Sequence, residues 1–336
     1  YTCISAIYFG GSVRCAVNPE TAFEGEDWLA PAAEKRHIAV VGGGPAGMET
    51  ARRLALRGHR VTLIERSRVL GGTLRFAAIA YEPNERLLDW LVREIGQSDV
   101  DVRLGEEASP ELLQSIGADA VVVATGARRD LYGVPGDDLA HVLNGDDLRR
   151  LMLGEKALPG RTKLGWADRA LAKAGAMTGA TSHPAVVREA SKAWMPLGER
   201  IVIIGGDLVG LELAEFLAHR GRKVTILDDA PKFGRGLQIV RRWRVLDDLR
   251  EAGVHFEPAA SDFAIDKAAV HATRSDGQRI AFPADHVILA RGAGADLRLA
   301  ERLQAAGFAP QVVGDAGGVG YIEGAMRGAA ELARTL

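Results

Sequence analysis

Apolar residues along this chain gather in short unbroken runs, and the longer stretches between them repeat an apolar residue every three or four positions. The short runs are typical of strands buried in a parallel sheet, and they cover 37–41, 120–124, 200–204, 284–290 and 311–315. The longer stretches predict helices with one buried face, and they cover 84–95, 238–253 and 322–336. Apolar residues alternate on both sides of Ser275-Asp276-Gly277, which predicts a β-hairpin. The order of these elements indicates an α/β fold.

One strand-turn-helix-strand segment of this pattern occurs twice. The run 37–41 leads into Gly-Gly-Gly-Pro-Ala-Gly, and the run 200–204 leads into Gly-Gly-Asp-Leu-Val-Gly. At a constant offset, glycine aligns with glycine and acid with acid: Gly42 with Gly205, Gly47 with Gly210, and Glu65 with Asp228. Such a segment is the fingerprint of a dinucleotide-binding fold. Two copies in register predict two Rossmann-like domains, and therefore a protein that handles, or once handled, two nucleotides.

The first copy has every glycine that the fingerprint requires. Its first glycine makes the tight turn, the second lets a diphosphate approach the helix N-terminus, and the third lets the helix pack closely on the strand, while the acid accepts a ribose hydroxyl. The candidate nucleotide-binding residues of this copy are Gly42, Gly44, Pro45, Ala46, Gly47, Glu65 and Arg66. The alternative is an α/β turn that binds nothing.

The second copy departs from the fingerprint at one position. Its candidate residues are Gly205, Asp207, Gly210 and Asp228, and Asp207 stands where the middle glycine is expected. A carboxylate about 5 Å from a diphosphate, at an effective dielectric near ~20, costs about 3 kcal/mol, or about a hundredfold in affinity, if it does not turn outward. If a nicotinamide nucleotide binds here, Asp228 favours NADH over NADPH. The alternative is a domain that keeps the fold but binds no nucleotide.

Composition limits the classes of function. The chain has 336 residues, enough for about two domains, and 47% hydrophobic residues with 40 glycines suit an α/β protein. Its net charge of -2 gives no reason to expect nucleic acid or a membrane surface as a partner. The sequence has no apolar run long enough to span a bilayer, no nucleophile elbow, no phosphate-loop lysine and no paired metal-binding histidines. Only two cysteines occur, which favours a reducing compartment, the cytoplasm.

Three further turns resemble those of the large class of flavoproteins with two dinucleotide domains, similar to glutathione reductase in fold. They are Ala124-Thr125-Gly126, Gly314-Asp315, and Gly72-Thr73-Leu74. The resemblance implies that these turns border a flavin and that the first domain binds FAD, with a family variant that holds only ADP as the alternative. Disulfide reduction in this class needs a cysteine pair beside the flavin. Because neither cysteine lies in these motifs, that chemistry is excluded.

The two cysteines resemble part of an iron–sulfur motif. Cys3-x11-Cys15, followed by Asn18-Pro19, matches the third and fourth ligands of Cys-x2-Cys-x3-Cys-x11-Cys in the multidomain NADH:flavin oxidoreductases. That family includes 2,4-dienoyl-CoA reductase, 2-enoate reductase and trimethylamine dehydrogenase. The resemblance implies a [4Fe-4S] cluster with Cys3 and Cys15 among its four thiolate ligands, and a partner barrel domain that binds flavin mononucleotide (FMN). The alternative is two ordinary thiols.

The family resemblance leaves three functions open. In the first, this chain is the C-terminal half of a reductase, in which electrons pass from NADH through FAD and the cluster to FMN, where an activated C=C bond is reduced. In the second, an amine dehydrogenase passes electrons outward to an electron-transfer protein, a route that Asp207 fits because it has no use for NADH. In the third, the chain is a nucleotide-binding scaffold without electron flow. In each case the substrate step lies in the barrel, so no catalytic acid or base is expected here. The sequence leaves a homo-oligomer open.

These patterns predict four segments along the chain. They are a lead-in with the partial cluster segment (1–36), an FAD-binding domain (37–150 with 291–336), a basic helical insert (151–198) and an NAD(P)H-binding domain (199–290). The insert is rich in Lys and Arg. Our hypothesis is that it docks, through Lys163 and Arg169, against the barrel or a phosphate-bearing substrate. The alternative is a solvated helical face.

Overall fold

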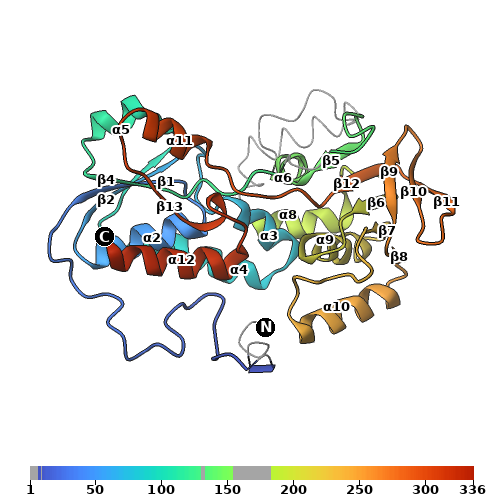
Figure 1. The fold of residues 1–336 in the computed structure, drawn as a ribbon, viewed down its shortest axis with the longest axis horizontal. Coiled ribbons are helices and arrows are strands. Elements are labelled where there is room, and N and C mark those ends of the chain that lie inside the picture. Colours follow the sequence, from blue (N-terminus) through green and yellow to red (C-terminus); the bar gives the residue numbers. More distant parts are fainter. Residues whose placement is uncertain (1–6, 9, 130–132, 154–182) are drawn as a thin grey trace. The chain divides into compact units, whose positions relative to one another are not determined.

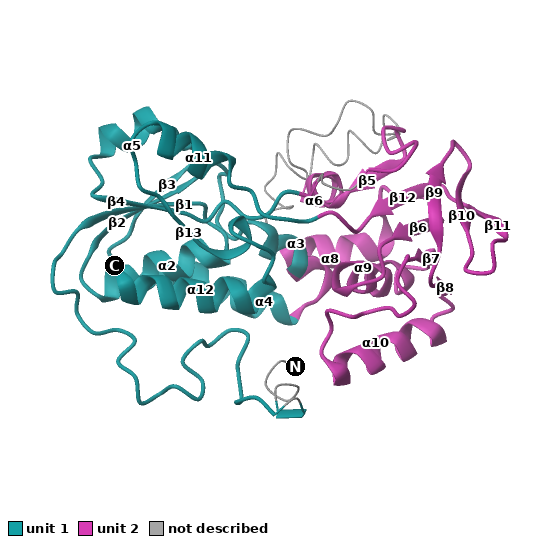
Figure 2. Cartoon of the chain, viewed as in Figure 1, with its two compact units in different colours: residues 1–77, 83–128, 293–336 teal, residues 78–82, 129–292 magenta. Residues whose placement is uncertain are grey.

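The computed structural model describes residues 7–8, 10–129, 133–153 and 183–336 (Figure 1). The chain forms two compact units (Figure 2). Residues 1–77, 83–128 and 293–336 make unit 1, and residues 78–82 and 129–292 make unit 2. Unit 2 is therefore inserted into unit 1 along the sequence. The prediction of an α/β fold in which a second Rossmann-like domain interrupts the first is confirmed.

Unit 1 is built around a five-stranded parallel sheet. In spatial order its strands are β13 (Gln311–Val312), β4 (Ala120–Val123), β1 (His37–Val41), β2 (Arg60–Glu65) and β3 (Asp101–Leu104). Strand β1 lies at the centre, with β2 and β3 on one side and β4 and β13 on the other. From β1 the chain therefore adds strands first in one direction and then in the other, and ligands of open α/β sheets bind at the point where this direction changes.

Helices cover both faces of this sheet. The helices of unit 1 are α2 (Pro45–Leu56), α4 (Pro83–Gly96), α5 (Pro110–Ile116), α11 (Arg298–Ala305) and α12 (Tyr321–Thr335), and α3 (Thr73–Ala80) begins in this unit. Successive side chains of a strand point to opposite faces. Ile38 and Val40 of β1 are buried with α2, α4 and α12, while Ala39 and Val41 are buried with α5 and α11. Figure 1 shows the two helical layers on opposite sides of the sheet.

Unit 2 repeats the parallel sheet and adds an antiparallel one. The parallel sheet has, in spatial order, β5 (Val142–Asn144), β12 (His286–Leu289), β6 (Arg200–Ile204), β7 (Lys223–Leu227) and β8 (His255–Glu257). The antiparallel sheet has β11 (Arg279–Pro283), β10 (Ala269–Thr273) and β9 (Ser261–Ile265). Its described helices are α6 (Gly145–Leu153), α8 (Pro184–Ala193), α9 (Leu208–Ala218) and α10 (Ile239–Glu251).

The antiparallel sheet packs on one face of the parallel sheet of unit 2. Val202 and Ile204 of β6 share a buried cluster with Phe263 of β9 and Val270 of β10. Helix α9 packs against β6 and β7. The predicted hairpin is confirmed as the β10–β11 pair. Across the described parts of both units, no helix is long and apolar enough to cross a membrane.

The inserted segment 129–292 begins and ends at neighbouring points of unit 1. The N–H of Arg128 donates to the carbonyl of Gly294 over 2.9 Å, and the N–H of Gly294 donates to the carbonyl of Arg128 over 3.0 Å. Both residues belong to unit 1. The backbone that leaves unit 1 is therefore tied to the backbone that returns to it.

Two predicted boundaries differ from the structure. Residues 129–150, predicted to belong to the first domain, lie in unit 2, because β5 pairs with β12 of the second sheet. The strand predicted at 311–315 ends at Val312, because Gly314 has a φ of +65° and begins a short 3-10 turn, η2 (Gly314–Ala316). Of the predicted insert, residues 151–153, at the end of α6, and residues 183–198 are described, and they lie in unit 2.

Candidate dinucleotide-binding sites

The turn after β1 has no room for a side chain at either end. Gly42 has a φ of +111°, and a Cβ there would lie 2.4 Å from the carbonyl oxygen of Ala124. A Cβ on Gly47 would lie 1.8 Å from the carbonyl oxygen of Gly42. Atoms do not approach so closely without backbone movement. The first and third glycines of the fingerprint therefore let the turn, α2 and the end of β4 pack together.

The middle glycine, Gly44, faces open space. A Cβ there would meet no atom within 4 Å, and its backbone is extended. Gly44 is the N-cap residue of α2, and no side chain caps this helix end. Pro45 occupies the first helical position, where a missing N–H costs nothing. The remaining N–H groups of the first turn and the positive end of the helix dipole are thus left for an anion, and this geometry fits a diphosphate.

Glu65, at the end of β2, holds the turn through its carboxylate. The side chain is 8% exposed, and its two oxygens accept the N–H of Gly43 over 2.6 Å and the N–H of Ser67 over 2.7 Å. Each carboxylate oxygen has a second lone pair, so the group can still accept a ribose hydroxyl. Arg66 beside it is exposed. The acid therefore combines a structural role with the charge that a ribose ligand needs.

The loop between β2 and α3 lies against the first turn. A Cβ on Gly72 would be 3.1 Å from the Cα of Gly44, so the two backbones nearly touch. The exposed Thr73 begins α3, and Leu74 is buried in the core of unit 1. The predicted turn 72–74 is therefore adjacent to the predicted diphosphate site.

Two further loops reach the same edge of the sheet, because they follow neighbouring parallel strands. After β4, Ala124 is buried, Thr125 is exposed, and Gly126 has a φ of +82°. After β13, Gly314 lies so close to α2 that its Cβ would be 2.6 Å from the Cβ of Ala46. The residues predicted to bind FAD thus come from loops that follow four adjacent strands of unit 1.

Asp315 is the acid of the loop after β13. Its half-buried side chain accepts the N–H of Gly320 through Oδ1 over 2.9 Å, which closes the loop that leads into α12. A carboxylate can accept more than one hydrogen bond, so Asp315 can also receive a hydroxyl of a bound ligand. The loop therefore supplies a negative charge that is held in place by the backbone.

The second copy reproduces the main features of the first. Gly205 has a φ of +118°, and a Cβ on Gly210 would lie 1.8 Å from the carbonyl oxygen of Gly205. Asp228, 5% exposed, accepts the N–H of Gly206 over 2.5 Å and the N–H of Ala230 over 2.8 Å. The acid at the end of β7 thus holds its glycine turn as Glu65 holds the first.

The duplication extends to a loop that the sequence analysis did not pair. The N–H of Gly71 donates to the carbonyl of Gly43 over 2.7 Å, and the N–H of Gly234 donates to the carbonyl of Gly206 over 2.7 Å. Phe233 packs on the second turn, since a Cβ on Gly206 would lie 2.0 Å from the phenyl ring. The constant offset of the repeat also relates Gly71 to Gly234, so the equivalence of these two loops could have been predicted from the sequence.

The two copies differ at the N-terminus of the helix. Asp207 takes the position of Gly44 and is the N-cap residue of α9. Its Oδ1 accepts the N–H of Leu208 over 2.9 Å and the N–H of Gly236 over 2.7 Å. The first N–H of α9 therefore already has a carboxylate partner, whereas α2 has no side-chain cap.

Charged side chains surround the second turn. Arg291 pairs with Asp229, with Nη2 2.8 Å from Oδ2. Partial burial raises the pKa of Asp229, but the hydrogen bond and charge of Arg291 outweigh burial. A hydrogen bond with Asp228 and the charge of Arg235 add to the effect of Arg291, so the pKa lies below its usual range. The second turn is thus a mixed-charge site.

Both copies carry a glutamate near the start of the helix, in different surroundings. Glu49 of α2 is buried and pairs with Arg53. Burial raises the pKa of Glu212 of α9 to about 7; the charge of Arg241 opposes this shift, and that of Glu215 adds to it. Arg241 itself pairs with Glu215 over 2.5 Å. The surroundings of Glu212 therefore favour its protonated form.

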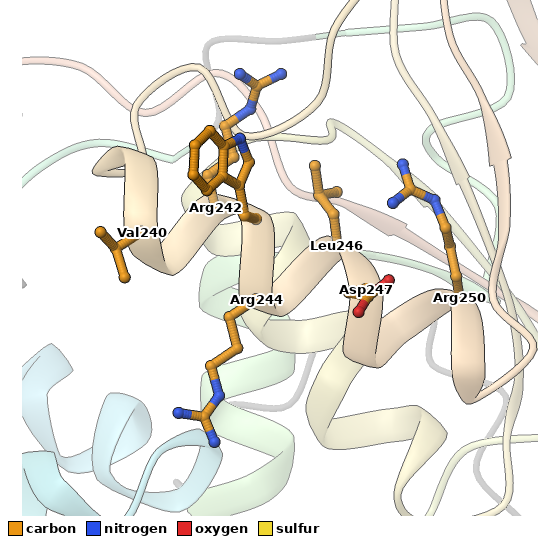
Figure 3. A pocket seen from close by; sticks show the side chains of 7 residues that line it. Val240, Arg242, Arg244, Leu246, Asp247 and Arg250 are labelled. Carbon is orange, nitrogen blue, oxygen red and sulfur yellow. The ribbon is translucent and has the colours of Figure 1, made fainter.

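A shallow pocket lies along α10 (Figure 3). It has a volume of about 620 Å³ and is lined by Val240, Arg242, Trp243, Arg244, Leu246, Asp247 and Arg250. Trp243 is 65% exposed. None of the predicted nucleotide-binding residues lines this pocket.

The predicted metal ligands and the basic insert are only partly described. Cys15 is a half-buried free thiol, and Cys3 lies outside the described residues. In the described ranges no group of three or more His, Cys, Asp or Glu side chains is placed so that it could hold a metal ion.

The basic insert is also only partly described, because Lys163 and Arg169 lie outside the described residues. Arg188 of α8 donates to the carbonyl of Ala78 over 2.7 Å, a contact within unit 2. The predicted iron–sulfur cluster and the predicted docking of the basic insert therefore stay predictions.

Known proteins resemble this chain over most of its length. A sequence profile described as pyridine nucleotide-disulphide oxidoreductase matches residues 36–311. Bilirubin reductase of Mediterraneibacter gnavus (strain CC55_001C) is 29% identical over 315 residues, which are 93% of this chain and 42% of that protein. NADH oxidase of Thermoanaerobacter brockii is 28% identical over 318 residues, 92% of this chain and 42% of that protein.

A solved structure has a similar fold. A 2-naphthoyl-CoA reductase in complex with 2-naphthoyl-CoA matches all of this chain, and 45% of its own, with a TM-score of 0.82 and 22% identity. The chain thus spans less than half the length of these curated relatives. Together the matches confirm the resemblance to the multidomain NADH:flavin oxidoreductases.

Proposed function

Because the chain belongs to the pyridine nucleotide-disulphide oxidoreductase family, we propose that it carries electrons from NADH, bound by unit 2, to FAD, bound by unit 1. Its relatives are oxidoreductases, and the family domain implies binding of FAD and a nicotinamide nucleotide. In the proposed larger enzyme the electrons continue through a [4Fe-4S] cluster to FMN in a barrel domain. There they reduce an activated C=C bond of the enoyl or dienoyl type.

The observation that carries this proposal is the open helix end of α2. Gly44 leaves the N-terminus without a side-chain cap, and the carboxylate of Glu65 is fixed beside the turn by the N–H of Gly43. Phosphate and ribose are the two groups that this pair of features recognises. The adenosine diphosphate half of FAD contains both groups next to each other.

The residues of this chain would position the flavin and would not react with it. When bound, FAD supplies the exchange between two-electron donors and one-electron acceptors. Thr125 and Gly126 after β4 and Asp315 after β13 border the same edge of the sheet as the first turn, and we assign them to the isoalloxazine and ribityl side. Disulfide exchange is not proposed, because both cysteines precede β1 and neither lies in a glycine turn.

Anaerobic titration tests the proposal. The purified chain should be yellow, and one equivalent of NADH should bleach the visible absorbance of the oxidised flavin. A protein that is colourless, and that takes up no FAD when supplied with it, would overturn the proposal. A colourless chain that retains ADP would point to a nucleotide-binding scaffold.

A second candidate function, an amine dehydrogenase, is favoured by Asp207. Its carboxylate occupies the helix end at which a nicotinamide nucleotide would place its diphosphate. In this case the electrons would come from an amine oxidised in the barrel and would leave to a separate electron-transfer protein. A yellow chain that neither NADH nor NADPH reduces would favour this second candidate over the first.

A further inference from the structure

The two repeats act as an internal comparison, because most of their contacts agree. In both, the buried acid after the second strand accepts the N–H of the second glycine, over 2.6 Å from Gly43 to Glu65 and over 2.5 Å from Gly206 to Asp228. In both, the following loop donates to the carbonyl of that same glycine. A difference at one position in this shared frame therefore reflects the side chains there and not a different fold.

The difference falls on two glycines that approach each other in unit 1. Gly44 and Gly72 nearly touch, since a Cβ on Gly72 would be 3.1 Å from the Cα of Gly44. At the same offset in unit 2 stand Asp207 and Arg235. Where unit 1 has bare backbone around an open helix end, unit 2 therefore has two charged side chains.

The carboxylate of Asp207 takes up the hydrogen bonds of its own turn. Its Oδ1 accepts the first N–H of α9, from Leu208, and also the N–H of Gly236 in the loop after β7. A Cβ on Gly236 would lie 3.0 Å from this oxygen, so the loop is packed directly on the carboxylate. The anion that the helix end attracts is thus part of the protein, and it ties the loop to the turn.

We propose that Asp207 is a specificity-determining residue of unit 2, an internal anion that weakens the binding of any ligand that places a diphosphate at the N-terminus of α9. A diphosphate would have to displace the carboxylate from Leu208 and would then lie close to its charge. Two charges about 5 Å apart at an effective dielectric near ~20 correspond to about a hundredfold in affinity. This inference rests on the proposed function only in taking unit 2 as the nicotinamide-binding unit.

The test compares NADH binding by three forms of the whole chain: the unchanged protein, Asp207→Asn and Asp207→Gly. Asparagine keeps the size and the helix-capping ability of aspartate but removes its charge, and glycine restores the residue of the first repeat. Binding is measured by calorimetry, with adenosine as a control ligand that carries no phosphate. We expect the Kd for NADH to fall at least tenfold in Asp207→Asn and about a hundredfold in Asp207→Gly, while the affinity for adenosine stays the same.

Two results would overturn the inference. One is an unchanged Kd for NADH in both variants, including the case in which no form binds NADH. The other is weaker NADH binding in Asp207→Asn with unchanged thermal stability, which would make Asp207 a ligand of the nucleotide. Flavin content, read from the visible absorbance of the same samples, separates this test from the proposed function. Loss of FAD would count against FAD binding by unit 1 and not against the role of Asp207.

Discussion

The carboxylate of Glu65 accepts the backbone N–H of Gly43 over 2.6 Å and so joins the end of β2 to the turn that follows β1. The bond is buried, since the side chain of Glu65 is 8% exposed. The acid that is expected to bind a ribose is therefore also a structural brace of the glycine turn. Its removal should affect both stability and ligand binding, and the repeat provides a way to separate the two effects.

Replacement of Glu65 by alanine should destabilise the protein by about 1–3 kcal/mol, because it leaves the N–H groups of Gly43 and Ser67 without their partner. It should also lower FAD content. The matched control is Asp228→Ala, which removes the equivalent hydrogen bonds in unit 2. Urea unfolding should show similar losses in both variants, and flavin absorbance should fall in the first alone. Equal FAD retention in both would contradict the assignment of Glu65 to FAD.

Gly44→Asp should reproduce in unit 1 the arrangement of unit 2. The position has an extended backbone and open space around a Cβ, so the fold should tolerate the side chain. The new carboxylate would cap α2 and repel the diphosphate, and FAD affinity should fall about a hundredfold. Gly44→Asn is the uncharged control and should retain more flavin. Full flavin occupancy in Gly44→Asp would show that the diphosphate does not bind at this helix end.

Gly47→Ala should be poorly tolerated even though the change adds one methyl group. The new Cβ would lie 1.8 Å from the carbonyl oxygen of Gly42, so α2 and the turn must move apart. We expect a loss of about 1–3 kcal/mol or more in the free energy of unfolding. Gly96→Ala, at the end of α4 with nothing within 4 Å of its Cβ, should be neutral or slightly stabilising. Comparable thermal midpoints for both variants would refute the close-packing explanation.

Glu212 should make stability depend on pH. Its pKa is raised from 4.5 to about 7, mainly by burial, so the folded state favours the protonated form. The stability that this preference contributes is fully present below the unfolded pKa and is lost as the pH rises through the folded pKa. Relative to the unchanged protein, Glu212→Gln should therefore gain on the order of 2 kcal/mol more at pH 8 than at pH 5.

Urea unfolding at the two pH values measures this effect. Glu49→Gln in unit 1 is the comparison, because Glu49 is paired with Arg53, and loss of that partner should destabilise the protein at both pH values. A gain for Glu212→Gln that is the same at pH 5 and pH 8 would be inconsistent with a titrating group near neutral pH.

Sequence reasoning succeeded where the determinants are local. The glycine turns are specified by a few adjacent residues, and the strands β1 and β6 that carry them are unbroken apolar runs. The constant offset placed both acids, Glu65 and Asp228, at the ends of equivalent strands. These features depend on short stretches of chain, so their pattern is visible without knowledge of the fold.

Prediction from the sequence failed where the structure depends on contacts between distant segments of the chain. Residues 129–150 contain β5, but the other strands of its sheet come much later in the chain, and only the pairing of β5 with β12 places this stretch in unit 2. The hydrogen bond from the N–H of Gly236 to Asp207 also depends on a distant contact, because the loop must fold back on a turn about thirty positions earlier. The sequence predicted repulsion at Asp207 but not the loop that holds its carboxylate.

The paired hydrogen bonds between Arg128 and Gly294 hold the two ends of the inserted segment 129–292 together, so this segment could be removed or replaced at one place. Because the outgoing and incoming backbones already lie next to each other, a short hairpin could bridge them after excision, and the five-stranded sheet of unit 1 would keep all its strands. The same junction would accept a graft of the corresponding segment from a relative. If unit 2 binds the electron donor as proposed, such a graft would change the donor at a single splice point without redesign of the rest of the protein.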